Sequence, residues 1–285
     1  MISRKKHWPF LNADDILGVA QNHGTIAQKE GRSLPLTPVS FLIVCPLLFL
    51  AGLVDSIGGG GGLISLPAYI LTGLPVHQAI ATNKLSSSCG TSLSTIRFLR
   101  HGLINLKLAV PSVVAALAGS SLGAHLSLLV SEEIMKYVLF AVLPIAAFFV
   151  LNRHLFKDHD GGAVFNKRTL IVCILSAFII GGYDGFYGPG TGTFLIIAFT
   201  VFARMSVSAA NAQAKVINLT SNITSLAVFL LNGQVLIPLG LAAAACNMAG
   251  NWVGSGLAIA KGTKIIRPVI LLVLLLLLAK ILFGF

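Results

Sequence analysis

The chain has 285 residues, of which 55% are hydrophobic and only 10% are charged, and its mean hydropathy is +0.89. Because soluble domains carry about 25% charged residues, this composition excludes an ordinary soluble protein and predicts a membrane protein. The net charge of +11 does not indicate nucleic-acid binding, because the basic residues fall mostly in short gaps between apolar segments and form no stripe with interleaved aromatic side chains.

The apolar segments, taken in chain order, follow a polar tail of residues 1–33 that lacks the apolar core of a cleavable signal peptide. A membrane-spanning helix needs about 20 apolar residues. This length predicts spanning helices at 36–56, 79–99, 108–130, 134–152, 168–184, 209–231, 238–260 and 265–284. Two shorter apolar runs, 63–74 and 194–203, follow glycine-rich breaks and are typical of broken or re-entrant helices. We therefore expect an all-α polytopic membrane protein.

An internal repeat is visible when the chain is shifted by 131 residues (215 − 84 = 131), which aligns Lys84 with Lys215. The register continues without a gap from the Ala81/Ala212 pair to the Ile134/Ile265 pair. This alignment predicts two duplicated membrane units. The expected divisions are the tail 1–33, repeat 1 at 34–152, a central loop at 153–167 and repeat 2 at 168–285.

The charges in the loops favour inverted repeats. The gap 97–107 is basic, whereas its counterpart 228–238 has no charge. Likewise the gap 131–136 contains two glutamates, and its counterpart 262–267 is basic. Basic loops favour the cytoplasm, so equivalent loops prefer opposite sides of the membrane. The basic residues of the tail favour a cytoplasmic N-terminus instead, and two parallel repeats are therefore the alternative.

Each repeat carries a lysine and an aspartate within apolar sequence: Lys84 and Asp55 in the first, Lys215 and Asp184 in the second. Ionisable groups at membrane depth are costly and mark functional sites. We expect the two lysines to bind a substrate. The aspartates either neutralise the lysines or exchange protons as ion-coupling groups. Both lysines lie about one turn inside their predicted helices, so extension of the amines to the membrane surface is the alternative.

Glycines follow each aspartate, as a run at 58–62 and as an alternating series at 188–192. A helix break frees backbone N–H groups, and the positive end of the next helix favours an anion. Close helix packing is the alternative role. The candidate anion-binding glycines are Gly59, Gly60, Gly61, Gly188, Gly190 and Gly192.

Polar residues recur at helical spacing after each lysine and form a stripe on one face. Such a stripe predicts a substrate pathway, although polar side chains also hold membrane helices together. The candidate binding residues on the stripes are Asn83, Ser87, Ser88, Asn218 and Asn222. Two G-x-x-x-G motifs, Gly119 to Gly123 and Gly250 to Gly254, predict close helix packing.

Motifs for other chemistry are missing from the sequence. It has no H-E-x-x-H or Cys/His ligand spacing, no nucleotide-binding loop, and no complete G-x-S-x-G turn. We therefore expect no metal, no cofactor, no catalytic residues and no enzymatic activity.

Five segments resemble the TauE/SafE family of sulfite-exporter-like membrane proteins, and the resemblance covers roughly residues 40–285. They are D-S-I-G-G-G-G-G-L-I-S-L-P (55–67), A-T-N-K-L (81–85), Y-D-G-F-Y-G-P-G-T-G (183–192), A-K-V-I-N-L-T-S-N-I (214–223) and K-G-T-K-I-I-R-P (261–268). The resemblance implies two repeated halves and transport of sulfite, related sulfur-containing anions or organosulfonates.

The expected function is thus secondary transport of a small anion across the plasma membrane, the inner membrane of a bacterium, with proton coupling through Asp55 or Asp184. The expected partners are the lipid bilayer and a small anionic substrate, with no nucleic acid. An anion channel and a non-transporting membrane enzyme or scaffold are the alternatives.

Overall fold

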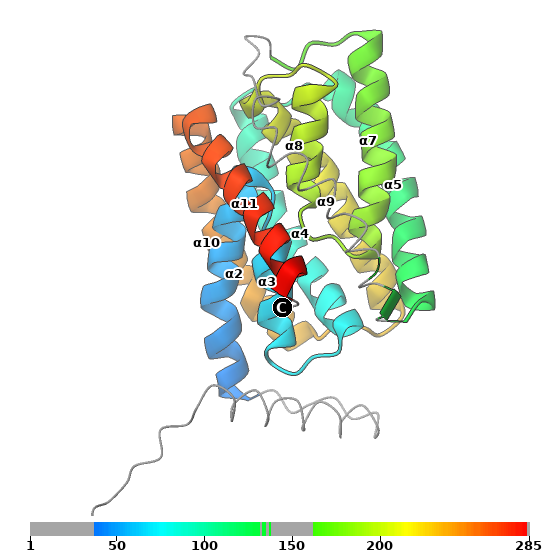
Figure 1. Cartoon of the computed structure of the whole chain (residues 1–285), viewed down its shortest axis with the longest axis vertical. Coiled ribbons are helices and arrows are strands. Elements are labelled where there is room, and N and C mark those ends of the chain that lie inside the picture. The colour runs from blue at the N-terminus through cyan, green and yellow to red at the C-terminus, as the bar shows by residue number, and fades with distance from the viewer. Residues whose placement is uncertain (1–36, 132, 135–136, 138–161, 284–285) are drawn as a thin grey trace, which may run out of the picture.

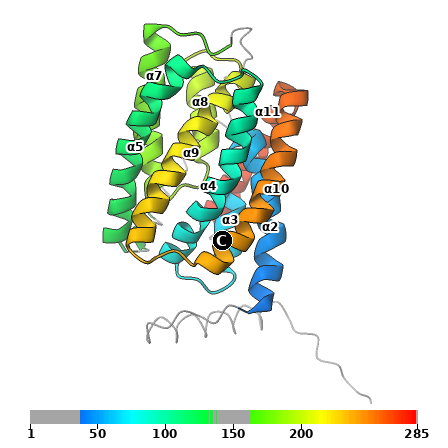
Figure 2. The same ribbon diagram turned by 180° about the vertical axis from the view of Figure 1, so that it is seen from behind.

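The structure is a computed structural model that describes residues 37–131, 133–134, 137 and 162–283 (Figures 1 and 2). Every regular element in these ranges is an α-helix. The helices are α2 (Pro38–Gly58), α3 (Gly62–Ile70), α4 (Val76–Arg100), α5 (Leu106–Leu129), α7 (Lys167–Phe186), α8 (Thr191–Val201), α9 (Val207–Leu231), α10 (Ile237–Lys261) and α11 (Thr263–Phe283). The all-α prediction is confirmed for the described part of the chain.

The predicted segments match these helices within a few residues, and the two short runs are the short helices α3 and α8. The predicted helix 134–152 lies outside the described residues apart from positions 134 and 137. Four described helices, α2, α5, α7 and α9, are long and apolar enough to cross a membrane. This is fewer than the eight expected. Helix α4 is 25 residues long but too polar to meet this criterion, and many of its polar side chains are buried against other helices.

The helices form two bundles, and each bundle combines helices from both halves of the sequence. In the first bundle, α2 packs in parallel against α10, since Gly52 lies on Asn247 and Gly254 lies on Ser56. Helix α4 runs parallel to α10 on the other side, because Gly240 lies on Leu85 and Arg97 lies over the ring of Trp252.

The second bundle contains α5, α7 and α9. Helix α5 packs in parallel against α7, since Gly119 lies on Phe178 and Gly123 lies on Gly182. A Cβ atom at Gly119, Gly123, Gly250 or Gly254 would overlap a neighbouring helix. The packing role predicted for both G-x-x-x-G motifs is therefore confirmed.

The bundles meet where α4 and α9 cross. These helices run in opposite directions, because Lys84 in the first half of α4 contacts Asn222 in the second half of α9, and Thr95 farther along α4 contacts the carbonyl of Lys215 in the first half of α9. The short helices α3 and α8 fill the space beside this crossing, and α11 packs against α2.

Basic residues gather at one end of the bundle, the upper end in Figure 1, where α4 and α10 end and α5, α7, α9 and α11 begin. The first residue of α2 lies at the opposite end (Figure 1). Apart from Lys84, Lys215 and Lys280, this end holds every lysine and arginine of the described ranges: Arg97, Arg100, Lys107, Lys167, Arg168, Arg204, Lys261, Lys264 and Arg267.

Candidate functional site

The two helix breaks lie against each other at the centre of the molecule. Gly59 caps the end of α2 with a positive φ of 82° that suits glycine, and Gly190 caps the start of α8 with a φ of 83°. The backbone N–H of Thr193 donates to the carbonyl of Gly59 (3.3 Å), and its hydroxyl donates to the carbonyl of Gly58 (2.6 Å). Gly59 and Gly192 are so close that neither position has room for a Cβ atom. Close packing, the alternative role of the glycines, is therefore present at this contact.

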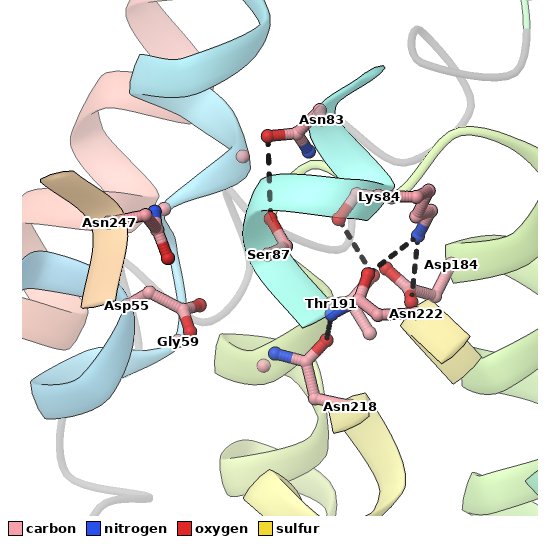
Figure 3. A pocket seen from close by; sticks show the side chains of 14 residues that line it. Asp55, Gly59, Asn83, Lys84, Ser87, Asp184, Thr191, Asn218, Asn222 and Asn247 are labelled. Carbon is pink, nitrogen blue, oxygen red and sulfur yellow. Dashed lines mark hydrogen bonds and ion pairs between the residues drawn. The ribbon is translucent and has the colours of Figure 1, made fainter. Parts of the chain in front are cut away.

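Lys84 reaches across the contact between the bundles. Its Nζ lies 2.9 Å from Asp184 Oδ2 and donates to Asn222 Oδ1 at 3.1 Å (Figure 3). The Ser221 hydroxyl donates to the same Asp184 oxygen. Asn222 in turn donates to Asn218 Oδ1 at 3.1 Å, so the lysine heads a chain of polar side chains from α9.

Lys215 forms the second ion pair. Its Nζ lies 2.8 Å from Asp55 Oδ2 and also donates to the main-chain oxygen of Asp55. The neighbouring Asn211 donates to the carbonyl of Ser56 at 3.1 Å. Lys215 is thus fixed to the last turn of α2, by backbone as well as side chain.

Both ion pairs connect opposite halves of the sequence, and both are buried. Lys84 and Lys215 are 2% and 0% exposed. Helices α4 and α9 begin at Val76 and Val207, so each lysine lies eight residues, or about 12 Å, into its helix (84 − 76 = 8; 215 − 207 = 8). The alternative in which the lysines extend to the membrane surface is therefore wrong.

A small cavity lies between the two breaks and the polar faces of α4 and α9. It encloses about 20 Å³, room for roughly one water molecule. The predicted site residues that line it are Asp55, Gly59, Gly61, Asn83, Lys84, Ser87, Asp184, Gly188, Gly192, Asn218 and Asn222. The start of α3 at Gly62 and the start of α8 at Thr191 also face it, so the positive ends of two short helices converge there.

Four predicted site residues do not line this cavity. Lys215 contacts Asp55, which lies between it and the cavity, and Gly60 packs against Val273 of α11. The Ser88 hydroxyl donates to the carbonyl of Lys84 at 2.7 Å, within its own helix. Gly190 caps the start of α8.

Three lining residues were missed in the sequence: Gly62, Thr191 and Asn247. The first two continue the glycine breaks already identified. Asn247 projects from α10 on the side of the cavity that also holds Asp55 and Gly59 (Figure 3). An asparagine within the apolar run 239–249 was the signal that could have identified it, because polar groups inside membrane helices are expensive.

The arrangement is suited to binding a small anion by exchange. Two lysines and two aspartates balance in charge, so an incoming anion must replace a carboxylate as the partner of a lysine. Lys84 is the cation that lines the cavity, beside the amide groups of Asn83, Asn218 and Asn222. Among the described residues no group of three His, Cys, Asp or Glu side chains could hold a metal ion.

Comparison with known proteins gives consistent matches. The family model described as "Sulfite exporter TauE/SafE" matches residues 44–281. The chain is 37% identical over 238 residues to "Probable membrane transporter protein ORF9" of Sinorhizobium sp, covering 82% of this chain and 88% of that protein. It is 34% identical over 254 residues to "Probable membrane transporter protein YfcA" of Escherichia coli K12, covering 86% and 93%. A "Probable membrane transporter protein" of Haemophilus influenzae is 35% identical over 237 residues, covering 83% and 92%. No solved structure matches significantly.

Proposed function

Because the chain belongs to the sulfite exporter TauE/SafE family of membrane transporters, we propose that it is a secondary transporter of a small sulfur-containing oxyanion or organosulfonate. The membrane in which it acts is the plasma membrane, the inner membrane of a bacterium. The observation that carries the proposal is the small central cavity at which Lys84, the amides of α4 and α9 and the starts of two short helices converge.

Binding proceeds by exchange at Lys84. The anion takes the place of the Asp184 carboxylate beside the amine and accepts from the asparagine amides. A proton carried by one of the two aspartates, Asp55 or Asp184, would offset the negative charge that the anion brings into the site. Anion and proton therefore favour each other's binding, which is the coupling that a secondary transporter requires.

Two observations support an inverted repeat. The shift of 131 residues aligns α5 with α10 and α4 with α9, and the aspartates align α2 with α7. Helix α4 runs antiparallel to α9, and the parallel pairs α2–α10 and α5–α7 run in opposite directions (Figure 1). Equivalent helices thus have opposite directions, as inverted repeats require, and the parallel alternative loses its support.

The moving bodies in this proposal are the two bundles and not the two halves of the sequence. Tight glycine contacts bind α2 to α10 and α5 to α7, so neither half can move without breaking them. The bundles meet at α4 and α9, and the cavity lies beside that contact. Because a sulfite ion is larger than one water molecule, the bundles must separate for binding, which is the alternating-access movement.

The basic end of the bundle faces the cytoplasm in this proposal, since basic loops remain on that side. The first residue of α2 then lies on the outer side.

The test is anion flux in liposomes that contain the purified full-length protein. We would measure saturable uptake of sulfite and of methanesulfonate, with acetate as the comparison anion. Counterflow, the exchange of internal for external substrate, separates a carrier from an anion channel. Folded protein that moves neither sulfur anion would reject the proposed substrate class.

The control for folding is deletion of a whole ion pair. Lys84→Ala alone leaves Asp184 charged, buried and unpaired, which destabilises strongly. The double variant Lys84→Ala/Asp184→Ala removes both charges and is expected to fold. If Lys84 binds the anion, the folded double variant has no saturable flux. Normal flux in that variant would assign the pair a purely structural role and favour a scaffold or another site.

A further inference from the structure

A second group of basic residues lies outside the central site, where α10 ends and α11 begins. A surface cavity of about 590 Å³ at this corner is lined by Lys261, Thr263, Lys264, Arg267 and Pro268. None of these lining residues is acidic. The corner falls within the segment K-G-T-K-I-I-R-P, which the transport proposal leaves without a role.

The charges at this corner are not balanced within the described part of the chain. Arg267 is half-buried, and its Nε atom is buried without a hydrogen-bond partner among the described residues. Lys264 and Arg267 also lie in the first turns of α11, where the positive end of the helix dipole disfavours cations, and the first turn has no acidic residue. A bound anion would correct both deficits.

A phosphate group fits these requirements. Its oxygens can accept from the planar guanidinium of Arg267 and from the mobile amines of Lys261 and Lys264 together. Basic pockets between membrane helices at the cytoplasmic surface are typical sites for anionic lipid headgroups. This corner belongs to the basic end of the bundle, the upper end in Figure 1, which faces the cytoplasm in the transport proposal.

The outer face of α11 favours a lipid over a free ion. Exposed positions follow each other at steps of four, four and three residues: Lys264, Pro268, Leu272 and Leu275. Leu272 and Leu275 are 48% and 51% exposed. The face therefore changes from cationic to apolar along the helix, as a phospholipid changes from phosphate to acyl chain.

We propose that this corner binds the phosphate of an anionic phospholipid between Lys264 and Arg267, with an acyl chain along Leu272 and Leu275. The proposal does not depend on which substrate the central site transports. Bound in this way, the lipid bridges α11 to the end of α10 and stabilises the junction.

The experiment measures lipid binding to the purified full-length protein by native mass spectrometry and by its thermal unfolding in detergent. The probes are phosphatidylglycerol, phosphatidylcholine and inorganic phosphate. The test variants are Lys264→Gln/Arg267→Gln and the single Lys264→Gln, which changes an exposed side chain and leaves the half-buried Arg267 in place. The matched control is Lys167→Gln/Arg168→Gln, which removes the same charge from the same end of the bundle.

We expect phosphatidylglycerol to bind and stabilise the protein more than phosphatidylcholine does. At about 1 kcal/mol for each cation, the double variant should weaken this binding about thirtyfold, the single variant about fivefold and the control little. Equal binding of the two lipids, or equal weakening in the control, would overturn the site. Stabilisation by inorganic phosphate without an effect of phosphatidylglycerol would overturn the proposal that the ligand is a lipid and would assign the corner to a soluble anion.

Discussion

The two ion pairs come from matched positions in the sequence, yet the structure uses them differently. Lys84 lines the cavity, and within the described part of the chain its partners are two side chains, those of Asp184 and Asn222. Lys215 lies outside the cavity and is bound to the backbone of α2 as well as to the Asp55 carboxylate. The carboxylates differ in the opposite sense: Asp55 is 14% exposed, whereas Asp184 is 4% exposed and accepts a further bond from Ser221.

This difference teaches that duplication of a sequence does not duplicate a role. One pair presents its lysine to the cavity and fixes its aspartate, and the other fixes its lysine and leaves its aspartate more accessible. In the transport proposal, Lys84 is therefore the anion ligand and Asp55 is the more accessible carboxylate for proton exchange.

The largest expected effect comes from removing either lysine alone. Lys84→Met and Lys215→Met should each lower the free energy of unfolding by about 3–5 kcal/mol, because a buried carboxylate loses its partner. The loss should be greater for Lys215→Met, since the bond to the carbonyl of Asp55 is lost as well. Chemical unfolding in micelles measures both values. A smaller loss of stability for Lys215→Met than for Lys84→Met would contradict the firmer attachment of Lys215 to α2.

The glycine breaks provide the second comparison. Gly59→Ala forces a Cβ atom onto the backbone of Gly192 at a positive φ, and left-handed strain plus overpacking amounts to about 3 kcal/mol. Gly188→Ala has similar strain, but its Cβ atom would first meet Asp184 Oδ1 at 2.9 Å, with the Asp184 carbonyl and Lys84 Nζ at 3.3 Å, so it disturbs the ion pair more than the backbone contact. We expect Gly59→Ala to reduce stability more and Gly188→Ala to reduce anion flux more.

The control for these two glycines is Gly102→Ala, which has a positive φ of 68° but open space around it. It should cost about 1–2 kcal/mol from left-handed strain alone and leave flux unchanged. A loss for Gly59→Ala no larger than that of Gly102→Ala would show that the contact between the breaks is not tight.

The third comparison concerns the aspartates. Asp184→Asn should lower the free energy of unfolding by about 2 kcal/mol, because the amide oxygen can still accept from Lys84 but no longer balances the charge of the buried ammonium. Asp55→Asn should lower it less. Asp55→Asn should also make flux insensitive to an imposed pH gradient, since an amide cannot carry the proton. Flux that still follows the gradient in Asp55→Asn would reject this aspartate as the coupling group.

The smallest effect is expected at Ser221. Ser221→Ala removes the hydroxyl that fixes Asp184 and should cost about 1 kcal/mol. The matched control is Thr224→Ala on the same helix, whose hydroxyl bonds only to the carbonyl of Thr220. If Ser221 holds the carboxylate beside Lys84, only Ser221→Ala should change the apparent affinity for the transported anion.

Much of the fold could be predicted from the sequence, because apolar length alone identifies helices in a chain of this composition. The short helices α3 and α8 were also predicted, since each follows glycines and is too short to cross a membrane. The starts of α4 and α9 were placed too late, because Val76 and Val207 open the helices before the apolar runs that were counted. That displacement placed the lysines only about one turn inside the predicted helices, which is why extension to the membrane surface was left open as the alternative.

The composition of the site was largely predicted, but its connections were not. The residue types showed that Lys84, Lys215, Asp55 and Asp184 required partners, since unpaired charges are unstable in an apolar interior. The pairing of Lys84 with Asp184 and of Lys215 with Asp55 depends on how α4 and α9 cross, which no local pattern encodes. Asn247 was missed for a similar reason, because its relevance follows from the contact between α2 and α10.

The contact between α2 and α10 has a consequence for the synthesis of the chain. Asn247 of α10 donates to the carbonyl of Leu48 in α2, across 199 residues of sequence. At a synthesis rate of about 5–20 residues per second, α10 follows α2 from the ribosome by roughly 10–40 s. During that interval the small-residue face around Gly52 is covered by lipid or by the insertion machinery. The first half of the protein therefore remains in the membrane without α10 until that helix is inserted.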